Sequence, residues 1–312
     1  MEKPRIGWIG TGVMGASMAG HLLKGEYPVS VYNRTRHKAQ ALLDAGAQWR
    51  DSPQEVAQAS DIVFSIVGYP HDVEETLLGE KGVLAGLATG GVVCDMTTSS
   101  PALAERIAQA AAAKGCTALD APVTGGDVGA RNATLSILVG GDAAAFARLM
   151  PCFELMGKRI THFGAPGMGQ QAKLANQTAI AGLMFSVCES LLYAHEAGLD
   201  VRVWLETVSS GAAGSTALNN LGPRILDGNF APGFYSAHFL KDLELCVAEC
   251  RRMKLVLPGL GLAEQLYRLM AANGRDKDGT QALILALAAL SGREWATVPA
   301  APPQDSPADK AQ

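Results

Sequence analysis

Three polar side chains share one face of a segment that is otherwise rich in apolar residues. Lys173, Asn176 and Gln177 stand at i, i+3 and i+4, which makes them neighbours if the segment is helical. The lysine lies near the expected start of the helix, where its charge opposes the helix dipole, so stability alone gives no reason for it. Such a face offers an ammonium proton donor beside two amides. A surface lysine that reaches solvent is the alternative for this segment taken alone.

A glycine-rich turn near the start of the chain is typical of a dinucleotide site. It follows an apolar, strand-like segment and opens a helix-like one. Gly10 permits the tight bend, Gly12 lets the backbone approach a pyrophosphate, and Gly15 lets the helix pack against the sheet. We therefore predict that the turn binds the phosphates of a dinucleotide, with a glycine turn that binds nothing as the alternative. The residues concerned are Gly10, Thr11, Gly12, Val13, Met14 and Gly15.

The residues after the second expected strand indicate which dinucleotide is bound. That strand ends at Tyr32, and NAD sites usually place an acidic residue next, where it binds the ribose hydroxyls. This chain has Asn33, followed by Arg34, Thr35 and Arg36. Such donors can bind a 2′-phosphate, which an acidic side chain would repel. The segment therefore favours NADP, with NAD as the alternative if the arginines only begin a solvated helix.

A second glycine turn follows a later strand. Asp120 ends that strand, and Thr124, Gly125 and Gly126 come shortly after it. Open α/β sheets bind ligands outside the carboxyl ends of their strands, and consecutive backbone N–H groups in such a turn can form an anion-binding nest. The segment predicts a site for a substrate carboxylate, helped by the threonine hydroxyl. An ordinary turn is the alternative.

These motifs require a scaffold whose strands end at one edge. Between residues 5 and 163, short apolar runs alternate with helix-like segments. This alternation predicts an α/β fold, a Rossmann-type doubly wound parallel sheet, followed by a second, all-helical domain. We expect strands at 6–9, 29–32, 62–67, 92–95, 118–120 and 135–139. The expected domains are an NADP-binding domain over 1–163, an interdomain helix over 164–195, a helical substrate and oligomerisation domain over 196–297, and a flexible tail over 298–312.

Composition argues against several other classes of protein. A net charge of -4 provides no basic field for nucleic acid, and 48% hydrophobic with 18% charged residues is typical of a globular protein. No uninterrupted apolar run reaches the roughly 18 residues of a membrane span, and the N-terminus lacks the features of a signal peptide. The six cysteines form neither a C-x-x-C pair nor a cluster with histidine, so we expect reduced thiols, no metal site and a cytoplasmic location.

Together the segments resemble the β-hydroxyacid dehydrogenase family, which includes 3-hydroxyisobutyrate dehydrogenase and tartronate semialdehyde reductase. The resemblance depends on the turn at 10–15, the segment 120–126, the Lys173 helix and the later Lys241-Asp242-Leu243. It extends in the same order over about residues 5–290. It implies that Lys173 is the catalytic lysine and that Lys241 lies near the nicotinamide.

The resemblance also implies roles for residues that carry no motif of their own. Substrate contacts fall at Thr124, Gly125, Gly126, Asn176 and Gln177. Further cofactor contacts fall at Val67, Gly68 and Thr98. The histidines at 162, 195 and 238 lie outside the family's signatures, so we expect them to be structural or solvated.

Two departures from the common family pattern bear on the substrate. Many members carry an asparagine where this chain has Gln177, and the Asn-Gln form resembles the tartronate semialdehyde reductase branch. The Asn33-Arg34-Thr35 step instead looks like the glyoxylate and succinic semialdehyde reductase branch. The expected substrate is therefore divided between two branches of the family.

These observations predict an NADP-preferring oxidoreductase that reduces a small aldehyde or keto acid to a hydroxy acid. Hydride transfer to an aldehyde leaves negative charge on oxygen, and Lys173 can supply both the stabilising charge and the proton. The alternatives are a 3-hydroxyisobutyrate dehydrogenase, an imine reductase and a non-catalytic NADPH-binding scaffold, and the presence of Lys173 argues against the last two. Apolar residues in the helical half, such as Leu191, Val203 and Leu283, predict a homo-oligomer, either dimer or tetramer.

Overall fold

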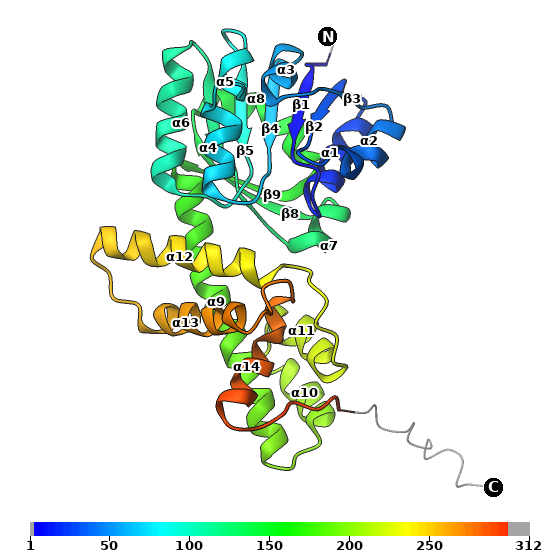
Figure 1. The fold of residues 1–312 in the computed structure, drawn as a ribbon, viewed down its shortest axis with the longest axis vertical. Helices are drawn as coiled ribbons and strands as arrows, with labels where there is room; N and C mark the ends of the chain where they lie inside the picture. The colour runs from blue at the N-terminus through cyan, green and yellow to red at the C-terminus, as the bar shows by residue number, and fades with distance from the viewer. Residues whose placement is uncertain (1–2, 299–312) are drawn as a thin grey trace, which may run out of the picture. The chain divides into compact units, whose positions relative to one another are not determined.

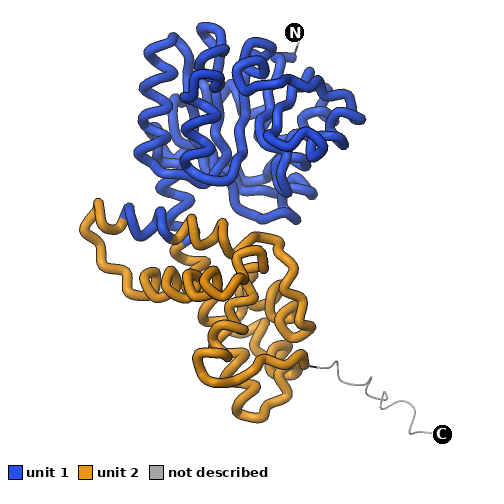
Figure 2. The backbone as a smooth tube through the Cα atoms, in the orientation of Figure 1, with its two compact units in different colours: residues 1–177, 244–249 blue, residues 178–243, 250–312 orange. Residues whose placement is uncertain are grey.

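The computed structural model describes residues 3–298. The chain forms two compact units, one of residues 1–177 with 244–249 and one of residues 178–243 with 250–312 (Figure 2). The tail expected over 298–312 lies outside the described residues except for Val298, whose N–H donates to the Leu226 carbonyl at 2.9 Å.

The first unit is built on one twisted sheet with a Rossmann order of strands. Its parallel part runs β3-β2-β1-β4-β5-β6, and β8 adds to β6 in the antiparallel direction, with β7 and β9 beside it. This arrangement confirms the expected doubly wound sheet. The strands are β1 (Ile6–Ile9), β2 (Val29–Tyr32), β3 (Gln48–Trp49), β4 (Ile62–Ser65), β5 (Val92–Asp95), β6 (Thr117–Asp120), β7 (Val123–Thr124), β8 (Leu135–Gly141) and β9 (Gly157–Gly164).

Helices cover both faces of this sheet (Figure 1). Several begin at a polar cap, as where the Ser52 hydroxyl accepts from the N–H of Glu55 and the Asp142 carboxylate accepts from that of Ala145. Caps of this kind contribute about 1 kcal/mol each. The helices are α1 (Gly15–Lys24), η1 (Arg36–Ala39), α2 (Gln40–Asp44), α3 (Pro53–Gln58), α4 (Pro70–Leu78), α5 (Val83–Gly86), α6 (Pro101–Ala113), α7 (Gly126–Arg131) and α8 (Ala143–Glu154).

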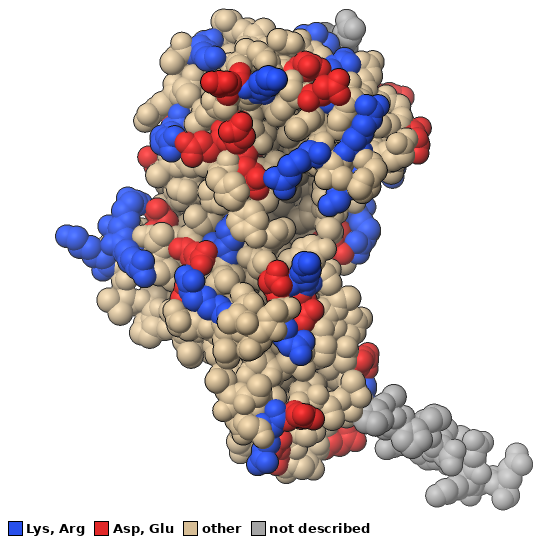
Figure 3. Space-filling model, viewed as in Figure 1, with Lys and Arg blue, Asp and Glu red and all other residues tan. Residues whose placement is uncertain are grey.

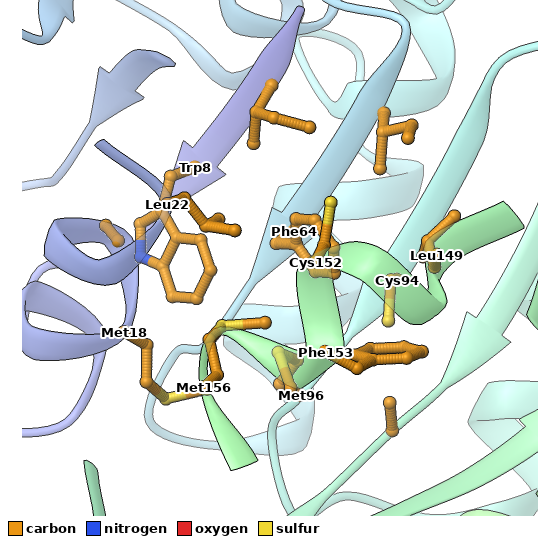
Figure 4. Packing of buried hydrophobic residues seen from close by; sticks show 14 of the residues in the cluster. Trp8, Met18, Leu22, Phe64, Cys94, Met96, Leu149, Cys152, Phe153 and Met156 are labelled. Atoms are coloured by element: carbon orange, nitrogen blue, oxygen red, sulfur yellow. The ribbon is translucent and has the colours of Figure 1, made fainter. Parts of the chain in front are cut away.

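The larger core cluster fills the space between the sheet and the helices α1, α2 and α8 (Figure 4). The rings of Trp8 and Phe64 lie 5.7 Å apart, and Phe153 meets Phe64 edge-on at 6.1 Å. Neighbouring strand residues such as Ile9 and Val63 belong to a second cluster under α3, α4 and α6, because side chains alternate along a strand. Each fully buried large side chain contributes roughly 1.5–3 kcal/mol, so both faces anchor the strand ends in place.

The second unit is helical in its described residues, as expected. Helix α9 (Met168–Glu196) begins in the first unit and continues into this one, where Phe239 and Tyr267 pack edge-on at 4.9 Å. By length and composition alone α9 could cross a membrane, a test that the core helix of a soluble protein also passes. The other helices are α10 (Val201–Ser209), α11 (Thr216–Leu226), α12 (Ser236–Met253), α13 (Pro258–Ala272), η2 (Thr280–Ala282) and α14 (Leu283–Leu290).

Most of the apolar residues that predicted an oligomer are core residues of this unit. Leu191, Leu205 and Leu283 are buried within the chain itself, so they need no partner, whereas Val203 and Leu290 remain exposed. On the face drawn in Figure 3, Lys and Arg side chains are interspersed with Asp and Glu over most of the surface.

Candidate functional site

The ends of five parallel strands bring the expected site residues of the first unit to one edge of the sheet. The glycine turn follows β1, Asn33 follows β2, Val67 follows β4, Thr98 follows β5, and Asp120 ends β6. Parallel strands share the direction of their carboxyl ends, so these segments are neighbours at that edge.

The three glycines of the first turn differ in whether the surrounding structure would accept a side chain. Gly10 has a φ of +97°, and a Cβ there would lie 2.0 Å from the Ile66 carbonyl oxygen. A Cβ on Gly15 would lie 2.1 Å from the Gly10 carbonyl oxygen, so the packing of α1 on the turn excludes any side chain. A Cβ on Gly12 meets nothing within 4 Å. The chain itself therefore requires glycine at 10 and 15, whereas Gly12 leaves open space beside the backbone.

Side-chain hydrogen bonds hold this turn against β2. The Trp8 indole donates to the Gly10 carbonyl at 2.8 Å, and the Thr11 N–H donates to Asn33 Oδ1 at 3.0 Å. Asn33 also donates through Nδ2 to the Thr35 carbonyl at 2.9 Å. The hydroxyl of Thr11 is buried with no hydrogen-bond partner among the described residues. An open backbone cradle and an orphaned donor beside it fit a phosphate group.

The basic residues after β2 lie at the surface. Arg34 is 85% exposed in its side chain and pairs with Asp72 Oδ1 at 3.2 Å. The guanidinium of Arg36 lies 4.9 Å from the ring centre of Trp49. Arg34 is therefore open to solvent, and an anion that it bound would compete with the Asp72 carboxylate.

The segments after β4 and β5 are joined through a buried carboxylate. Asp95 Oδ1 accepts from the Ser65 hydroxyl at 2.8 Å and from the Thr97 hydroxyl at 2.7 Å. The Val67 N–H in turn donates to Thr97 Oγ1 at 2.9 Å. Burial raises the pKa of Asp95 to about 6 despite these donors. Asp95 thus links the two segments that carry the expected cofactor contacts Val67 and Thr98.

The second glycine turn has a backbone conformation that requires glycine. Gly125 has a φ of +130° and Gly126 a φ of +64°, so both lie in the region that favours glycine. Both are exposed, and the half-buried Thr124 precedes them on β7. The structure therefore places Thr124, Gly125 and Gly126 in an exposed turn at the end of β7, shortly after β6.

The first turn of helix α9 is in close contact with the backbone of the sheet. A Cβ on Gly169 would lie 2.5 Å from the carbonyl oxygens of Asp120 and Leu138, and one on Gly140 would lie 2.6 Å from the Gly169 nitrogen. Such close approach is available only to glycine. The Asp120 carboxylate accepts from the N–H groups of Gly167 and Gln170 at 2.8 Å each. Burial raises the pKa of Asp120 to about 6.

Lys173 is buried, with 7% of its surface exposed. This burial contradicts the alternative of a surface lysine that reaches solvent. Asn176 is half-buried and donates through Nδ2 to the Oε1 atom of the buried Gln177 at 2.8 Å. The structure therefore brings these three side chains together on the part of α9 that belongs to the first unit.

The remaining expected residues belong to the second unit or make hydrogen bonds and close contacts within the first. Lys241 is a buried residue of α12 in the second unit, with its ammonium 3.0 Å from Asp242. His162 is hydrogen-bonded to the Gly141 carbonyl, and His195 lies beside Glu196. Gly68 lies close to Asp72, because a Cβ on this glycine would be 3.0 Å from that carboxylate. Residues 3–298 contain no cluster of side chains able to hold a metal ion.

A set of buried polar residues that supports the expected site belongs to none of the sequence motifs. Asp95, Thr97, Ser99 and Gln170 lie at most 4% exposed, and their hydrogen bonds join segments more than 70 residues apart in the chain. The one local signal was an unexplained carboxylate at the end of an apolar strand, at Asp95.

Comparison with known proteins identifies the family. Residues 5–164 match the family model described as the NAD binding domain of 6-phosphogluconate dehydrogenase, and residues 167–287 match that of the NAD-binding of NADP-dependent 3-hydroxyisobutyrate dehydrogenase. The chain is 57% identical to a probable 3-hydroxyisobutyrate dehydrogenase-like 1, mitochondrial, of Arabidopsis thaliana, over 93% of this chain and 87% of the relative. It is 39% identical to the 2-hydroxy-3-oxopropionate reductase of Escherichia coli, over 94% of this chain and 100% of the relative.

The chain belongs to the β-hydroxyacid dehydrogenase family. It is an NAD(P)-dependent oxidoreductase of that family, which confirms the expected class of enzyme and cofactor. A solved structure of Psf3 in complex with NADP+ and 2-OPP is similar at a TM-score of 0.84 and 26% identity, over 90% of this chain and 99% of that one. Solved imine reductases are also similar, at 20–21% identity, which shows a shared fold alone.

Proposed function

We propose that this β-hydroxyacid dehydrogenase uses NADPH to reduce a small aldehyde acid to a hydroxy acid, with Lys173 as the proton donor. The observation that carries the proposal is the burial of Lys173 beside Asn176 and Gln177 on a helix whose start is bound by Asp120. An ammonium in a largely buried site interacts more strongly with a charge than it would in water. It can therefore stabilise a substrate oxygen that becomes negative during the reaction.

Each group of residues would perform one part of the reaction. The N–H groups at Gly125 and Gly126, with the Thr124 hydroxyl, bind the substrate carboxylate and orient the aldehyde. Lys173 stabilises the developing alkoxide and transfers a proton from Nζ to its oxygen, while the Asn176 amide binds the same end of the substrate. NADPH, when bound, supplies the hydride. The turn at residues 10–15 would hold the pyrophosphate of that cofactor.

The preference for NADP is supported by the chemistry at the end of β2. No acidic residue follows Tyr32, and the Asn33 side chain is already engaged with the Thr11 N–H and the Thr35 carbonyl. Arg34 is exposed and able to exchange its carboxylate partner for a 2′-phosphate. The NADP+ in the similar Psf3 complex supports the same cofactor.

The proposed substrates are tartronate semialdehyde, glyoxylate and succinic semialdehyde, with 3-hydroxyisobutyrate in the oxidative direction as the alternative. All pair a carboxylate with a carbonyl or hydroxyl, which matches an anion nest and a lysine. The printed names of the two relatives divide between the same chemistries, because one is a 2-hydroxy-3-oxopropionate reductase and the other a 3-hydroxyisobutyrate dehydrogenase-like protein.

Initial rates of NADPH and NADH oxidation with these acids test the proposal. Replacing Lys173 by alanine should lower kcat by about 10²–10⁴-fold, the usual contribution of a general acid, with little change in NADPH affinity. Lys114→Ala is the control, because it removes another lysine of the first unit, one whose ammonium donates to the Leu84 carbonyl. A loss of less than about tenfold on Lys173→Ala would contradict the assignment.

Two further features are proposed for the whole protein. The first is a homo-oligomer, supported by exposed apolar side chains on the second unit such as Val203, Val256 and Leu290. The second is a reducing compartment such as the cytoplasm, supported by six cysteines that form no disulfide in the described part of the chain, of which only Cys250 is not buried. The Arabidopsis relative carries the word mitochondrial in its name, and that compartment is the alternative.

A further inference from the structure

The side chain of Gln170 makes two hydrogen bonds, to the residues on either side of one expected cofactor contact. Its Nε2 donates to the Thr97 carbonyl at 2.7 Å, and its Oε1 accepts from the Ser99 N–H at 2.8 Å. Both bonds are buried, and Gln170 has no exposed surface. The half-buried Thr98 lies between the two bonded residues. The amide orientation is fixed, since a carbonyl can only accept and an N–H can only donate.

The backbone of the same residue is bound from the other side. The Gln170 N–H donates to Asp120 Oδ2 at 2.8 Å, and the Gly167 N–H donates to Asp120 Oδ1. Asp120 begins the segment 120–126 that holds the expected carboxylate nest. One residue thus contacts the segment after β5 through its side chain and the last residue of β6 through its main chain.

Gln170 also lies three residues before Lys173, on the same face of α9. Side chains at i and i+3 on a helix have their Cβ atoms about 5–6 Å apart, so their positions are coupled by the rigid backbone. The space around Gln170 is nearly filled, because the cavity that it lines with Asp95, Ser99 and Asp120 measures only about 10 Å³. A displaced glutamine has little room to find other partners.

We propose that Gln170 is a positioning residue, which fixes the distance between the cofactor segment at Thr98 and the ammonium of Lys173. This inference rests on the proposed function, because it assigns both ends of that distance. Hydride donor and proton donor must reach the two ends of one carbonyl, so an error of about 1 Å between them can lower the rate by about 10²-fold. An apolar side chain of similar volume would fill the same space but would leave the Ser99 N–H and the Thr97 carbonyl without this partner.

The test compares two volume-conserving substitutions, Gln170→Met and Gln281→Met. Gln281 is the matched control, because it is equally buried and donates to two carbonyls, those of Asn229 and Ala231, in the second unit. We expect Gln170→Met to lower kcat by about 10- to 100-fold with an NADPH Kd within about threefold of the unmodified protein. Gln281→Met should change kcat by less than about threefold.

A double-mutant cycle separates positioning from general destabilisation. If Gln170 acts through Lys173, Gln170→Met should cost less than about threefold once Lys173 is already alanine. An undiminished loss in that background overturns the proposal, as does an equal loss in kcat for Gln170→Met and Gln281→Met. If Gln170→Met fails to fold, Gln170→Glu takes its place, because it keeps the shape and the Ser99 bond but sets a carboxylate against the Thr97 carbonyl.

Hydrogen exchange distinguishes failure of this inference from failure of the proposed function. Gln170→Met should speed amide exchange at least tenfold both at residues 97–99 and at residues 167–173, whereas Gln281→Met should do so at neither. Faster exchange at both segments in a protein that reduces no aldehyde acid supports the mechanical link and rejects the proposed function. Unchanged exchange with unchanged kcat in an active protein rejects the link alone.

Discussion

A substitution at Gly12 should change the affinity for the cofactor without lowering the stability of the fold. Its φ lies outside the left-handed region, and a Cβ there contacts nothing within 4 Å. Replacing Gly12 by alanine should therefore leave the stability unchanged or raise it by up to about 1 kcal/mol, because the unfolded chain loses freedom. Gly10→Ala should instead destabilise the fold by about 2–6 kcal/mol, from a strained φ and a 2.0 Å clash with the Ile66 carbonyl.

The effect of Gly12→Ala on cofactor binding follows from contact distances. A phosphate oxygen hydrogen-bonded to a backbone nitrogen lies about 2.7–2.9 Å away, whereas a methyl carbon holds an oxygen at about 3.3 Å or more. Losing one charge-assisted hydrogen bond costs about 1.5–3 kcal/mol, which raises the Kd by roughly 10- to 150-fold. NADPH should thus bind at least tenfold more weakly to a protein that folds as well as before.

Calorimetric titration with NADPH and thermal unfolding measure the two quantities on the same samples. Gly261→Ala is the control, because that glycine of α13 also has open space around it and lies in the second unit. It should gain about 1 kcal/mol of helix stability with no change in Kd. A Kd for Gly12→Ala within threefold of the unmodified protein would refute the assignment of this backbone to the pyrophosphate.

Three more predictions follow from the structure. Asn33→Asp combined with Arg34→Ala should shift the ratio of kcat/KM for NADPH over NADH toward NADH by at least tenfold, because a phosphate partner is lost and a repelling charge is added; an unmodified protein that already prefers NADH contradicts the phosphate site. The pKa values of Asp95 and Asp120 are about 6 in the folded chain against about 3.9 unfolded, so the folded chain holds more protons between these values and stability falls as pH rises through that window. Lowering pH from 7.5 to 5.5 should raise the contribution of this pair to the urea-unfolding free energy by about 1–2 kcal/mol, and Asp120→Asn should remove about half of that slope. Light scattering after size-exclusion chromatography should show a dimer or tetramer at micromolar concentration, and a 32.5 kDa species there would leave the oligomer without support.

Local patterns predicted the strands of the parallel sheet well. The segments expected at 6–9, 29–32 and 92–95 coincide with β1, β2 and β5, because each is an apolar run buried on both faces. Strand β9 was missed for the opposite reason. Its residues include Lys158, Arg159 and His162, and most of its side chains are at least partly exposed, so it carries no apolar run. The pairing with β8, which sequence periodicity cannot reveal, decides its conformation.

The motif segments have local signatures in the sequence, whereas the contacts that hold these segments in place have none. A glycine turn between a strand and a helix has a local signature, and so does a lysine on an apolar helix. The bonds of Gln170 to Thr97 and Ser99 connect residues more than 70 positions apart. Nothing in the sequence near Gln170 distinguishes it from Gln171, which instead donates to Glu249. Only the three-dimensional fold separates the two neighbouring glutamines.

The binding of the first turn of α9 by Asp120 has a consequence for the order of folding. The carboxylate that accepts from Gly167 and Gln170 comes from 47 and 50 residues earlier in the chain. It takes up that position only when β6 has paired with β5 and β8. Because a loop of this length must close before the contact forms, we expect the turn that precedes Lys173 to become ordered only after β6 has joined the sheet. An isolated chain starting at α9 would lack the Asp120 carboxylate and would fray at its first turn.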